Sequence, residues 1–343
     1  MKIRFYILTC LLFGGLVSCN DWLDVKPETE MTLEEMYADQ QGFQDALTGA
    51  YLELKNSSAY GTELMYGTIE YLAQHWDYTA ESIQEKISQF NYIDDNVQNR
   101  FTLIYTQLYK IILSVNAILE QIDAKQDVFE PGMYEIIKGE CLAMRAYCHF
   151  DLLRLFGPMP TRTTASKILP YVTKVGIEYN THHSYQEFTE LLENDLTDAG
   201  KLLYPFDPVI PAGEDREELN LSLSAARQIR FNYYAVKAME ARFYLWLGGD
   251  DNKAKAYDCA TEVIEAQDSE GKTVFTLGST DNIAKEDYSF STEHILAIYD
   301  YNLKDNADNT FTIKAEGYKD LALPLVVNVI KKLTPPQAVS CQK

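Results

Sequence analysis

Two long stretches of the chain repeat apolar residues every three or four positions, which is the period of one face of an α-helix. The first covers residues 97–122 and the second covers residues 132–156. The second stops at Gly157-Pro158, a pair that ends a helix and begins a turn. Both stretches are too long and too regular to be strands. They predict two long helices.

The same period recurs in four shorter segments. It follows a capping-box signature, Thr32 with Glu35, over residues 43–54, and another, Ser184 with Glu187, as far as residue 203. Further helices are expected at about 225–247 and 252–266. Only residues 273–277 and 294–299 have the short, apolar pattern of strands. Residues 205–220, rich in proline and acids, are predicted to form a long surface loop.

Two pairs of predicted helices have sequence features like those of tetratricopeptide repeats. In residues 234–266, small residues permit close helix approach and Gly248-Gly249 supplies a tight turn. Residues 134–155 and 184–203 form a second, degenerate pair with a long insertion. Such hairpins stack to bury a shared core. The predicted fold class is therefore mainly α, with tetratricopeptide-like helix pairs, long irregular loops and a few short strands.

The N-terminus has the pattern of a bacterial lipoprotein signal peptide. Lys2 and Arg4 precede an apolar run that is too short to span a bilayer. The run closes with Leu16-Val17-Ser18-Cys19, which is typical of a lipobox, so residues 1–18 are predicted to be removed and Cys19 to be acylated. The alternative is an ordinary secretory signal with a chance cysteine.

The chain is strongly acidic, with 30 basic and 51 acidic residues and a net charge of −21. Without residues 1–18 the charge is −23, because both bases of that segment leave with it. Such a surface repels phosphate, so nucleic acid and anionic lipid are excluded as electrostatic partners. Membrane attachment would depend on the lipid at Cys19.

The remaining cysteines show no disulfide or metal pattern. Cys141 and Cys148 are seven residues apart in a predicted helix, about 10.5 Å at the helical rise, which is beyond disulfide reach. They are interpreted as small core residues. The sequence has no CxxC spacing. No metal and no cofactor are therefore predicted.

Several segments together resemble the SusD/RagB family of surface nutrient-binding lipoproteins from Bacteroidetes. The start Cys19-Asn20-Asp21-Trp22-Leu23-Asp24 is similar to the usual mature N-terminus of that family. The other matching segments are Ala46-Leu47-Thr48-Gly49-Ala50-Tyr51, Tyr105 with Ile111 or Ile112 and Asn116, Gly139–Tyr147, Phe156-Gly157-Pro158-Met159-Pro160, Asp195-Leu196 with Ala199, Ala241–Leu245 and Val263-Ile264. The resemblance runs from Cys19 to about Asp300, and its motifs occur in the family's order.

The resemblance implies a SusD-like α/α superhelix over residues 19–343. Residues 19–220 would be its N-terminal region and residues 221–343 the start of a shortened C-terminal region, because the usual Pro-Ile-Pro and Asn-Pro-Gly-Tyr motifs are missing. It also implies a lipid-anchored, surface-exposed outer-membrane protein that binds an oligosaccharide or other nutrient. The ligand would be delivered to a partner TonB-dependent transporter (SusC-like).

Two other functions remain open from the residues themselves. One is a helical-repeat scaffold lipoprotein without a small ligand, and the other is an α-helical glycoside-processing enzyme. The enzyme is disfavoured because GxSxG, HExxH, P-loop and GxGxxG motifs are absent and no catalytic residue can be named. Paired carboxylates carry no weight in a chain with 51 acids.

Candidate ligand-binding residues lie in the irregular, aromatic-rich segment 56–96. His75-Trp76-Asp77-Tyr78 combines rings that stack on sugar C–H faces with polar groups for hydroxyls. Trp76, Asp77 and Tyr78 are therefore the leading candidates, and Tyr66 and Tyr92 are weaker ones. The alternative is that these rings pack beneath a loop. Tyr51, Tyr105 and Tyr147 are interpreted as helix-packing residues.

Three other polar features are given structural interpretations. Residues 207–218 are expected to form a solvated acidic loop, with cation binding as the less favoured alternative. His182-His183 is expected to be a helix entry, since adjacent residues point to different faces. Arg145, in an apolar helix, is expected to form a structural ion pair or carbonyl contact, with Glu140 or Asp151 as the first candidates.

Overall fold

The computed structural model describes residues 32–75, 78–210, 224–287, 289–303 and 305. The chain divides into two compact units, Met1–Ala38 and Asp39–Lys343. The described part of the first unit contains the one-turn helix α2 (Leu33–Met36), for which Thr32 and Glu35 form the predicted capping box. Cys19 and the predicted signal segment lie outside the described residues.

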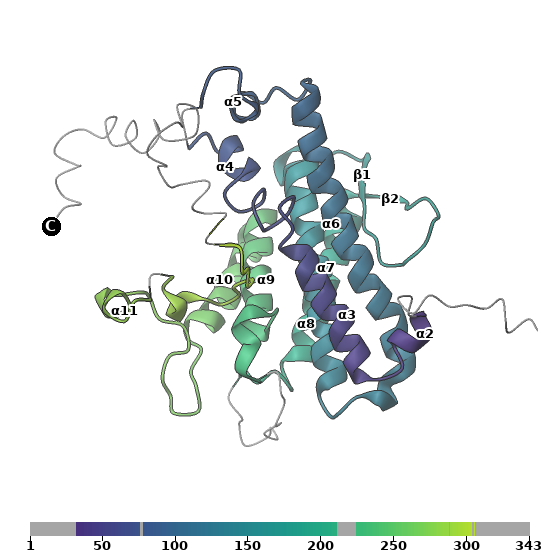
Figure 1. The fold of residues 1–343 in the computed structure, drawn as a ribbon, viewed down its shortest axis with the longest axis vertical. Coiled ribbons are helices and arrows are strands. Elements are labelled where there is room, and N and C mark those ends of the chain that lie inside the picture. Colours follow the sequence, from purple (N-terminus) through teal and green to yellow (C-terminus); the bar gives the residue numbers. More distant parts are fainter. Residues whose placement is uncertain (1–31, 76–77, 211–223, 288, 304, 306–343) are drawn as a thin grey trace, which may run out of the picture. The chain divides into compact units, whose positions relative to one another are not determined.

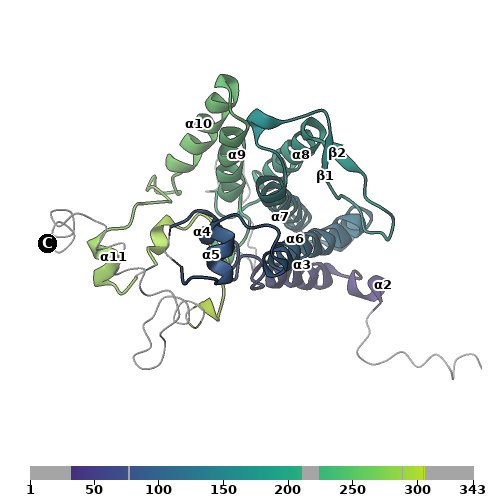
Figure 2. The ribbon, with the colours of Figure 1, turned by 90° about the horizontal axis from the view of Figure 1, so that it is seen from above.

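The second unit is mostly helical, as predicted. Its long helices lie side by side in the order α3, α6, α7, α8, α9, α10, and Figure 2 shows them from above. Short elements occupy the connections (Figure 1). The helices are α3 (Gln40–Leu54), α4 (Thr68–Leu72), α5 (Ile83–Ser88), α6 (Asp95–Ile122), α7 (Met133–Phe156), α8 (Tyr185–Leu203), α9 (Tyr233–Leu247), α10 (Asp250–Ile264) and α11 (Thr280–Ala284), with 3-10 turns η2 (Asp123–Val128), η3 (Pro160–Arg162), η4 (Ser224–Ile229) and η5 (Ser291–Glu293).

Helix α6 is the first of the two long helices that the apolar period predicts. Asp94 caps its start, and the Asp94 carboxylate accepts hydrogen bonds from the backbone amides of Asn96 and Val97. Its apolar stripe is fully buried; the stripe includes Ile104, Leu108, Ile111, Ile112, Val115, Ile118 and Ile122. The helix is long and apolar enough to cross a membrane by composition. Because it packs between α3 and α7, it is a core helix.

Helix α7 is the second long helix and lies at the centre of the array, between α6 and α8. It is buried on nearly every side from Ile136 to Leu153, which includes Cys141 and Cys148 as the predicted core residues. Helix α8 starts at the predicted capping box of Ser184 and Glu187. The α7–α8 pair is therefore the predicted degenerate hairpin.

Helices α9 and α10 form the other predicted hairpin. Asn232 caps α9 by accepting a hydrogen bond from the Ala235 amide at 2.8 Å, so the helix starts later than the expected residue 225. The turn is made by Gly248 and Gly249, whose φ angles of +71° and +82° are open to glycine but strained for other residues. The acids Asp250 and Asp251 then occupy the first turn of α10, where the helix dipole favours them.

The predicted strands are wrong. Within the described residues, segment 273–277 contributes one isolated bridge, Gln267 with Thr273, and segment 294–299 has no strand. The backbone of the latter is bonded instead to Asn232 and Gln228. The observed strands β1 (Lys167–Pro170) and β2 (His182–Ser184) pair antiparallel, with Leu169 opposite His183 and an irregularity between residues 167 and 169. His182 and His183 therefore lie in a strand that leads directly into α8.

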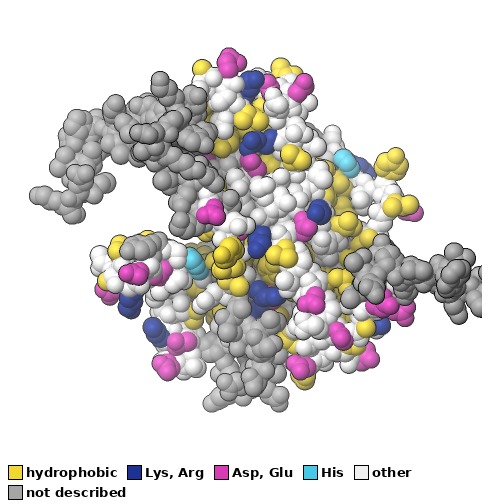
Figure 3. Space-filling view, in the orientation of Figure 1, with side chains coloured by type: hydrophobic (Ala, Val, Ile, Leu, Met, Phe, Trp, Pro, Cys, Tyr) yellow, Lys and Arg dark blue, Asp and Glu magenta, His cyan; other side chains and the backbone are white. Residues whose placement is uncertain are grey.

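The buried ionic groups also differ from expectation. Arg145 forms a structural ion pair as predicted, but its partner is Asp195 on α8, with nitrogen–oxygen distances of 2.6 and 2.7 Å. Asp207, expected in a solvated acidic loop, is fully buried and bonds to Arg227 through two hydrogen bonds of 2.8 Å. The rest of that acidic segment, from residue 211, lies outside the described residues. Figure 3 shows acidic side chains spread over one face rather than gathered in one patch.

Candidate functional site

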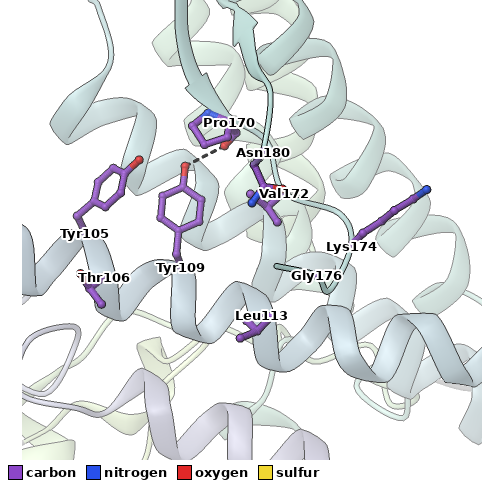
Figure 4. A pocket seen from close by; sticks show the side chains of 9 residues that line it. All are labelled: Tyr105, Thr106, Tyr109, Leu113, Pro170, Val172, Lys174, Gly176 and Asn180. Carbon is purple, nitrogen blue, oxygen red and sulfur yellow. Dashed lines mark hydrogen bonds between the residues drawn. The ribbon is translucent and has the colours of Figure 1, made fainter. Parts of the chain in front are cut away.

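A groove of about 390 Å³ lies between α6 and the segment that follows β1. Its walls combine two tyrosines and a threonine on α6 with apolar and polar residues of the connection between β1 and β2 (Figure 4). The lining residues are Tyr105, Thr106, Tyr109, Leu113, Pro170, Val172, Lys174, Gly176 and Asn180. A helix therefore forms one side of the groove and an irregular connection forms the other.

Two half-buried tyrosines form the helical side of the groove. Tyr105 and Tyr109 are four residues apart, so they project from the same face of α6, and their ring centroids are 4.8 Å apart. The ring of Phe156, at the end of α7, meets Tyr105 edge-on at 5.1 Å. These contacts fix the orientation of the Tyr105 ring while part of it stays exposed at the groove.

The Tyr109 hydroxyl fixes the distance between the two sides of the groove. It donates a hydrogen bond of 2.8 Å to the carbonyl oxygen of Pro170. Burial raises the pKa of the Tyr109 phenol well above its ordinary value, so the hydroxyl remains a donor at every physiological pH. The Pro170 carbonyl therefore has a permanent partner.

Residues 170–175, here called the groove wall, begin at the last residue of β1, which pairs with His182 of β2, and are held beyond it by side chains. The amide of Asn116 donates a 2.9 Å hydrogen bond to the Val172 carbonyl, and the Glu120 carboxylate accepts one of 2.6 Å from the Val175 amide. Tyr109, Asn116 and Glu120 lie at intervals of seven and four residues, so one stripe of α6 holds the wall. A wall anchored in this way presents a defined surface to a ligand.

The chemistry of the groove suits a ligand with apolar faces and polar edges. The tyrosine rings offer surfaces for stacking, and Thr106, Lys174 and Asn180 offer hydrogen-bond donors and acceptors at the rim. No carboxylate lines the groove, and no group of His, Cys, Asp and Glu with metal-binding geometry occurs in the described part of the chain. The lining residues therefore offer stacking surfaces and hydrogen-bonding groups to a ligand.

The site residues predicted from sequence that the structure describes do not line the groove, and each has its own contacts. The Tyr66 hydroxyl donates to the Gly61 carbonyl at 2.9 Å and is half-buried. The ring of Tyr78 packs edge-on against Tyr71 at 5.3 Å. Tyr92 is 51% exposed and meets Phe101 at 5.6 Å. Trp76 and Asp77 lie outside the described residues. A ligand-binding role for these five residues stays a prediction.

Tyr92 is connected to the groove by a row of aromatic rings. Its neighbour Phe101 meets Phe156 at 6.2 Å, and Phe156 meets Tyr105. The row therefore runs from the start of α6 to the groove, and each of its rings is at least partly exposed. The row links Tyr92, one of the weaker sequence candidates, to the groove through two other rings, although Tyr92 does not line the groove.

Sequence reasoning missed the two tyrosines of the groove. Tyr105 was assigned to helix packing because it fits the apolar period, but it lies at the edge of the buried stripe and is half-exposed. Tyr109 lies just off that stripe. A tyrosine pair four residues apart at the margin of an apolar stripe was the available signal. The opposite side of the groove could not be inferred, because it comes from a connection more than 60 residues further along the chain.

Comparisons with known proteins agree on one family. A family model described as "Starch-binding associating with outer membrane" (SusD-like) matches residues 21–208, more than half of the chain. The SusD-like protein P38 of Formosa agariphila is 28% identical over 207 residues, covering 59% of this chain and 37% of that protein. The chain thus spans little more than a third of the length of this curated relative.

Solved structures agree with the fold. A SusD superfamily protein from Bacteroides thetaiotaomicron has a TM-score of 0.61 at 12% identity, covering 87% of this chain and 63% of its own. A putative sugar-binding protein from Bacteroides vulgatus has a TM-score of 0.55 at 19% identity, covering 76% and 54%. At these identities the likeness concerns the fold alone.

Proposed function

This chain belongs to the SusD-like family of starch-binding, outer-membrane-associated proteins, and from that premise we propose that it captures a glycan in the groove between α6 and the groove wall. The observation that carries the proposal is the half-exposed pair Tyr105 and Tyr109, held at a groove that has polar groups at its rim. Sugar rings stack their C–H faces on such aromatic surfaces, while their hydroxyls bond to side chains at the edge.

The charge of the chain also supports a neutral ligand. With a net charge of −21, the protein repels anions at long range, whereas an uncharged glycan pays no electrostatic cost of approach. The groove has Lys174 as its sole charged lining residue. Stacking and neutral hydrogen bonds therefore dominate the expected recognition.

Replacing Tyr105 by alanine is expected to weaken glycan binding about tenfold, since an aromatic stacking contact is worth roughly 1–2 kcal/mol. The measurement is isothermal titration calorimetry with a starch oligosaccharide or with the best ligand from a glycan-binding screen. Tyr257→Ala is the matched control, because that tyrosine is exposed on α10 and lies outside the groove. Its affinity should equal that of the wild type.

Segment 75–78, which the sequence predicts to bind the ligand, is the alternative location of the glycan site. If Trp76→Ala abolishes binding while Tyr105→Ala leaves it unchanged, the glycan binds at segment 75–78 and the groove proposal is wrong. If both variants lose affinity, the ligand contacts segment 75–78 as well as the groove. The two sets of variants therefore separate the sequence-predicted site from the groove.

We further propose that the bound glycan is passed to a TonB-dependent outer-membrane transporter without being cleaved. The family-level description of starch binding in association with the outer membrane supports capture rather than catalysis. Release of reducing ends from a polysaccharide would favour the enzyme alternative. Absence of binding to every glycan pool, together with tight binding to a transporter, would favour the scaffold alternative.

Attachment to the outer membrane is proposed to depend on acylation of Cys19, with the protein facing the cell exterior. Replacing Cys19 by alanine should abolish incorporation of labelled palmitate and release the protein from the membrane fraction, because its acidic surface does not hold it there. Cys259→Ala is the control, since that thiol is half-buried on α10 and should not affect labelling. Lipid label that persists without Cys19 would refute the anchor.

A further inference from the structure

The groove wall is held by a histidine as well as by the stripe of α6. His149 of α7 is fully buried, and its Nε2 atom lies 3.0 Å from the backbone nitrogen of Val172. Its ring stacks on Tyr171, with ring centroids 3.8 Å apart and planes 15° apart. Val172 lines the groove. His149 therefore bonds directly to the backbone that forms the wall.

The hydrogen-bond partners of the two ring nitrogens of His149 require the neutral ring with its proton on Nδ1. Nδ1 lies 2.9 Å from the Arg145 carbonyl oxygen, which can only accept, so Nδ1 carries the proton. The Val172 amide can only donate, so Nε2 must be the bare nitrogen. A second proton, on Nε2, would remove the acceptor and place two N–H groups face to face. The bond to the wall thus requires the neutral ring.

On balance the surroundings of His149 disfavour a second proton on its ring, because burial outweighs the opposing effect of the hydrogen bond to the Arg145 carbonyl on its pKa. Arg145 lies one turn away on the same helix, Tyr109 meets the ring from α6, and His183 approaches from β2. The carboxylate of Asp195 on α8 is already bonded to Arg145 and to the hydroxyl of Tyr171, whose ring stacks on His149. Phe188 of α8 supplies an apolar contact. Burial, followed by the positive charge of Arg145, lowers the pKa of His149 well below its ordinary 6.5.

We propose that His149 is a positioning residue that holds the groove wall only while its ring is neutral, so that acidification loosens the wall and weakens ligand capture. The part that concerns capture rests on the proposed glycan function. The wall itself can be tested without any ligand. His183 is a second histidine at the wall, since its Nδ1 accepts from the Tyr171 amide at 3.1 Å, and the test must separate the two.

The lowered pKa of His149 determines how pH changes the equilibrium between the closed and the opened groove wall. When the wall is closed, His149 has a lowered pKa, whereas in an opened wall it would titrate near 6.5. The closed state therefore binds fewer protons below that pH, and closure weakens as the pH falls. The opening equilibrium should rise by up to tenfold for each pH unit below about 6.5, until the pKa of the closed state is reached.

Amide hydrogen exchange of the purified protein tests this directly. After correction for intrinsic exchange rates, protection of the Val172 amide should fall about tenfold between pH 6 and pH 5, relative to the buried Val263 amide on α10. His149→Gln retains a donor and an acceptor but cannot titrate, so its ratio should not change with pH. His183→Gln should behave like the wild type. A wild-type ratio that stays constant from pH 7 to pH 5 would overturn the proposal, whether or not His149→Gln folds.

Binding measurements on the same three proteins separate the role of His149 in holding the wall from the proposed glycan binding. Calorimetry with a starch oligosaccharide at pH 7 and pH 5 should show weaker binding at pH 5 in the wild type and in His183→Gln, but not in His149→Gln. If Val172 protection responds to pH while no glycan binds at any pH, His149 still holds the wall and the glycan function is wrong. If glycan binds equally at both pH values while protection falls, the wall does not control capture.

Discussion

Replacing Arg227 by methionine is expected to lower the free energy of unfolding by about 3–5 kcal/mol, since it breaks a buried ion pair by removing one partner. The guanidinium of Arg227 is buried and contacts two fully buried carboxylates, Glu140 of α7 and Asp207. Although burial alone would lower the pKa of Arg227, these two charges raise it above the ordinary value. The arginine is therefore charged, and its removal leaves two anions without their principal partner.

Both carboxylates keep other contacts in the variant. Arg230 reaches Glu140 at 3.4 Å, and the Tyr51 hydroxyl donates to the same carboxylate at 2.7 Å. Asp207 accepts a 2.8 Å bond from the Tyr233 amide, which neutralises no charge. Loss of Arg227 should therefore also loosen the junction between the end of α8 and the start of α9, where Asp207 and Arg227 stand on either side of residues 211–223.

Chemical denaturation followed by circular dichroism measures this change. Arg162→Met is the matched control, because that arginine is exposed in η3 and its replacement should change stability by less than about 0.5 kcal/mol. A loss below about 1 kcal/mol in Arg227→Met would mean that Glu140 and Asp207 are not buried anions. Replacement of Arg227, Glu140 and Asp207 together by apolar residues should be milder than the single change, since neither fully buried carboxylate then remains without its guanidinium partner.

The second large effect is expected at Asp195 on α8. Replacing it by leucine should also cost about 3–5 kcal/mol, because it removes the carboxylate that pairs with the buried Arg145 guanidinium and leaves neutral acceptors such as the Asn116 side-chain oxygen at 2.9 Å. The Tyr171 hydroxyl, 2.5 Å from Asp195, loses its acceptor as well. Both losses lie beneath the groove wall, so ligand capture should weaken together with stability.

Asp198 on the same helix offers a close control. It is three residues further along, forms an exposed pair with Lys201 at 3.1 Å, and its side chain is 59% exposed. Surface pairs of this kind contribute roughly 0–1 kcal/mol, so Asp198→Leu should scarcely change the denaturation midpoint. Equal losses in the two variants would contradict the burial of the Arg145–Asp195 pair.

The helical part of the fold could be predicted from sequence because its causes are local. The apolar period of α6 and α7, the capping box before α8 and the Gly248-Gly249 turn all act within a few residues. The strands were mispredicted because β1 and β2 are held by pairing and by side chains of α6 and α7, not by their own alternation. Residues 273–277 have a strand-like composition but no strand partner in the described part of the chain.

The candidate site was harder to predict because it depends on distant contacts. Arg145 was recognised as an ion-pair residue, but the choice of Asp195, fifty residues away, is made by the packing of α7 on α8. His149 carried no sequence signal, since a histidine on a buried helix face is indistinguishable from a packing residue until Val172 is placed against it. Tyr92 was selected from its irregular context, and the row of rings gives it a neighbour at the groove.

The central claim is that a glycan occupies the groove between Tyr105 and the groove wall. A crystal structure of the protein with a starch oligosaccharide, or with the best ligand of a glycan screen, tests it most directly. The account predicts a sugar ring stacked on Tyr105 or Tyr109, with its hydroxyls bonded to groups at the rim such as Thr106 or Asn180. A glycan bound away from these residues, or a screen in which no glycan binds, would contradict it.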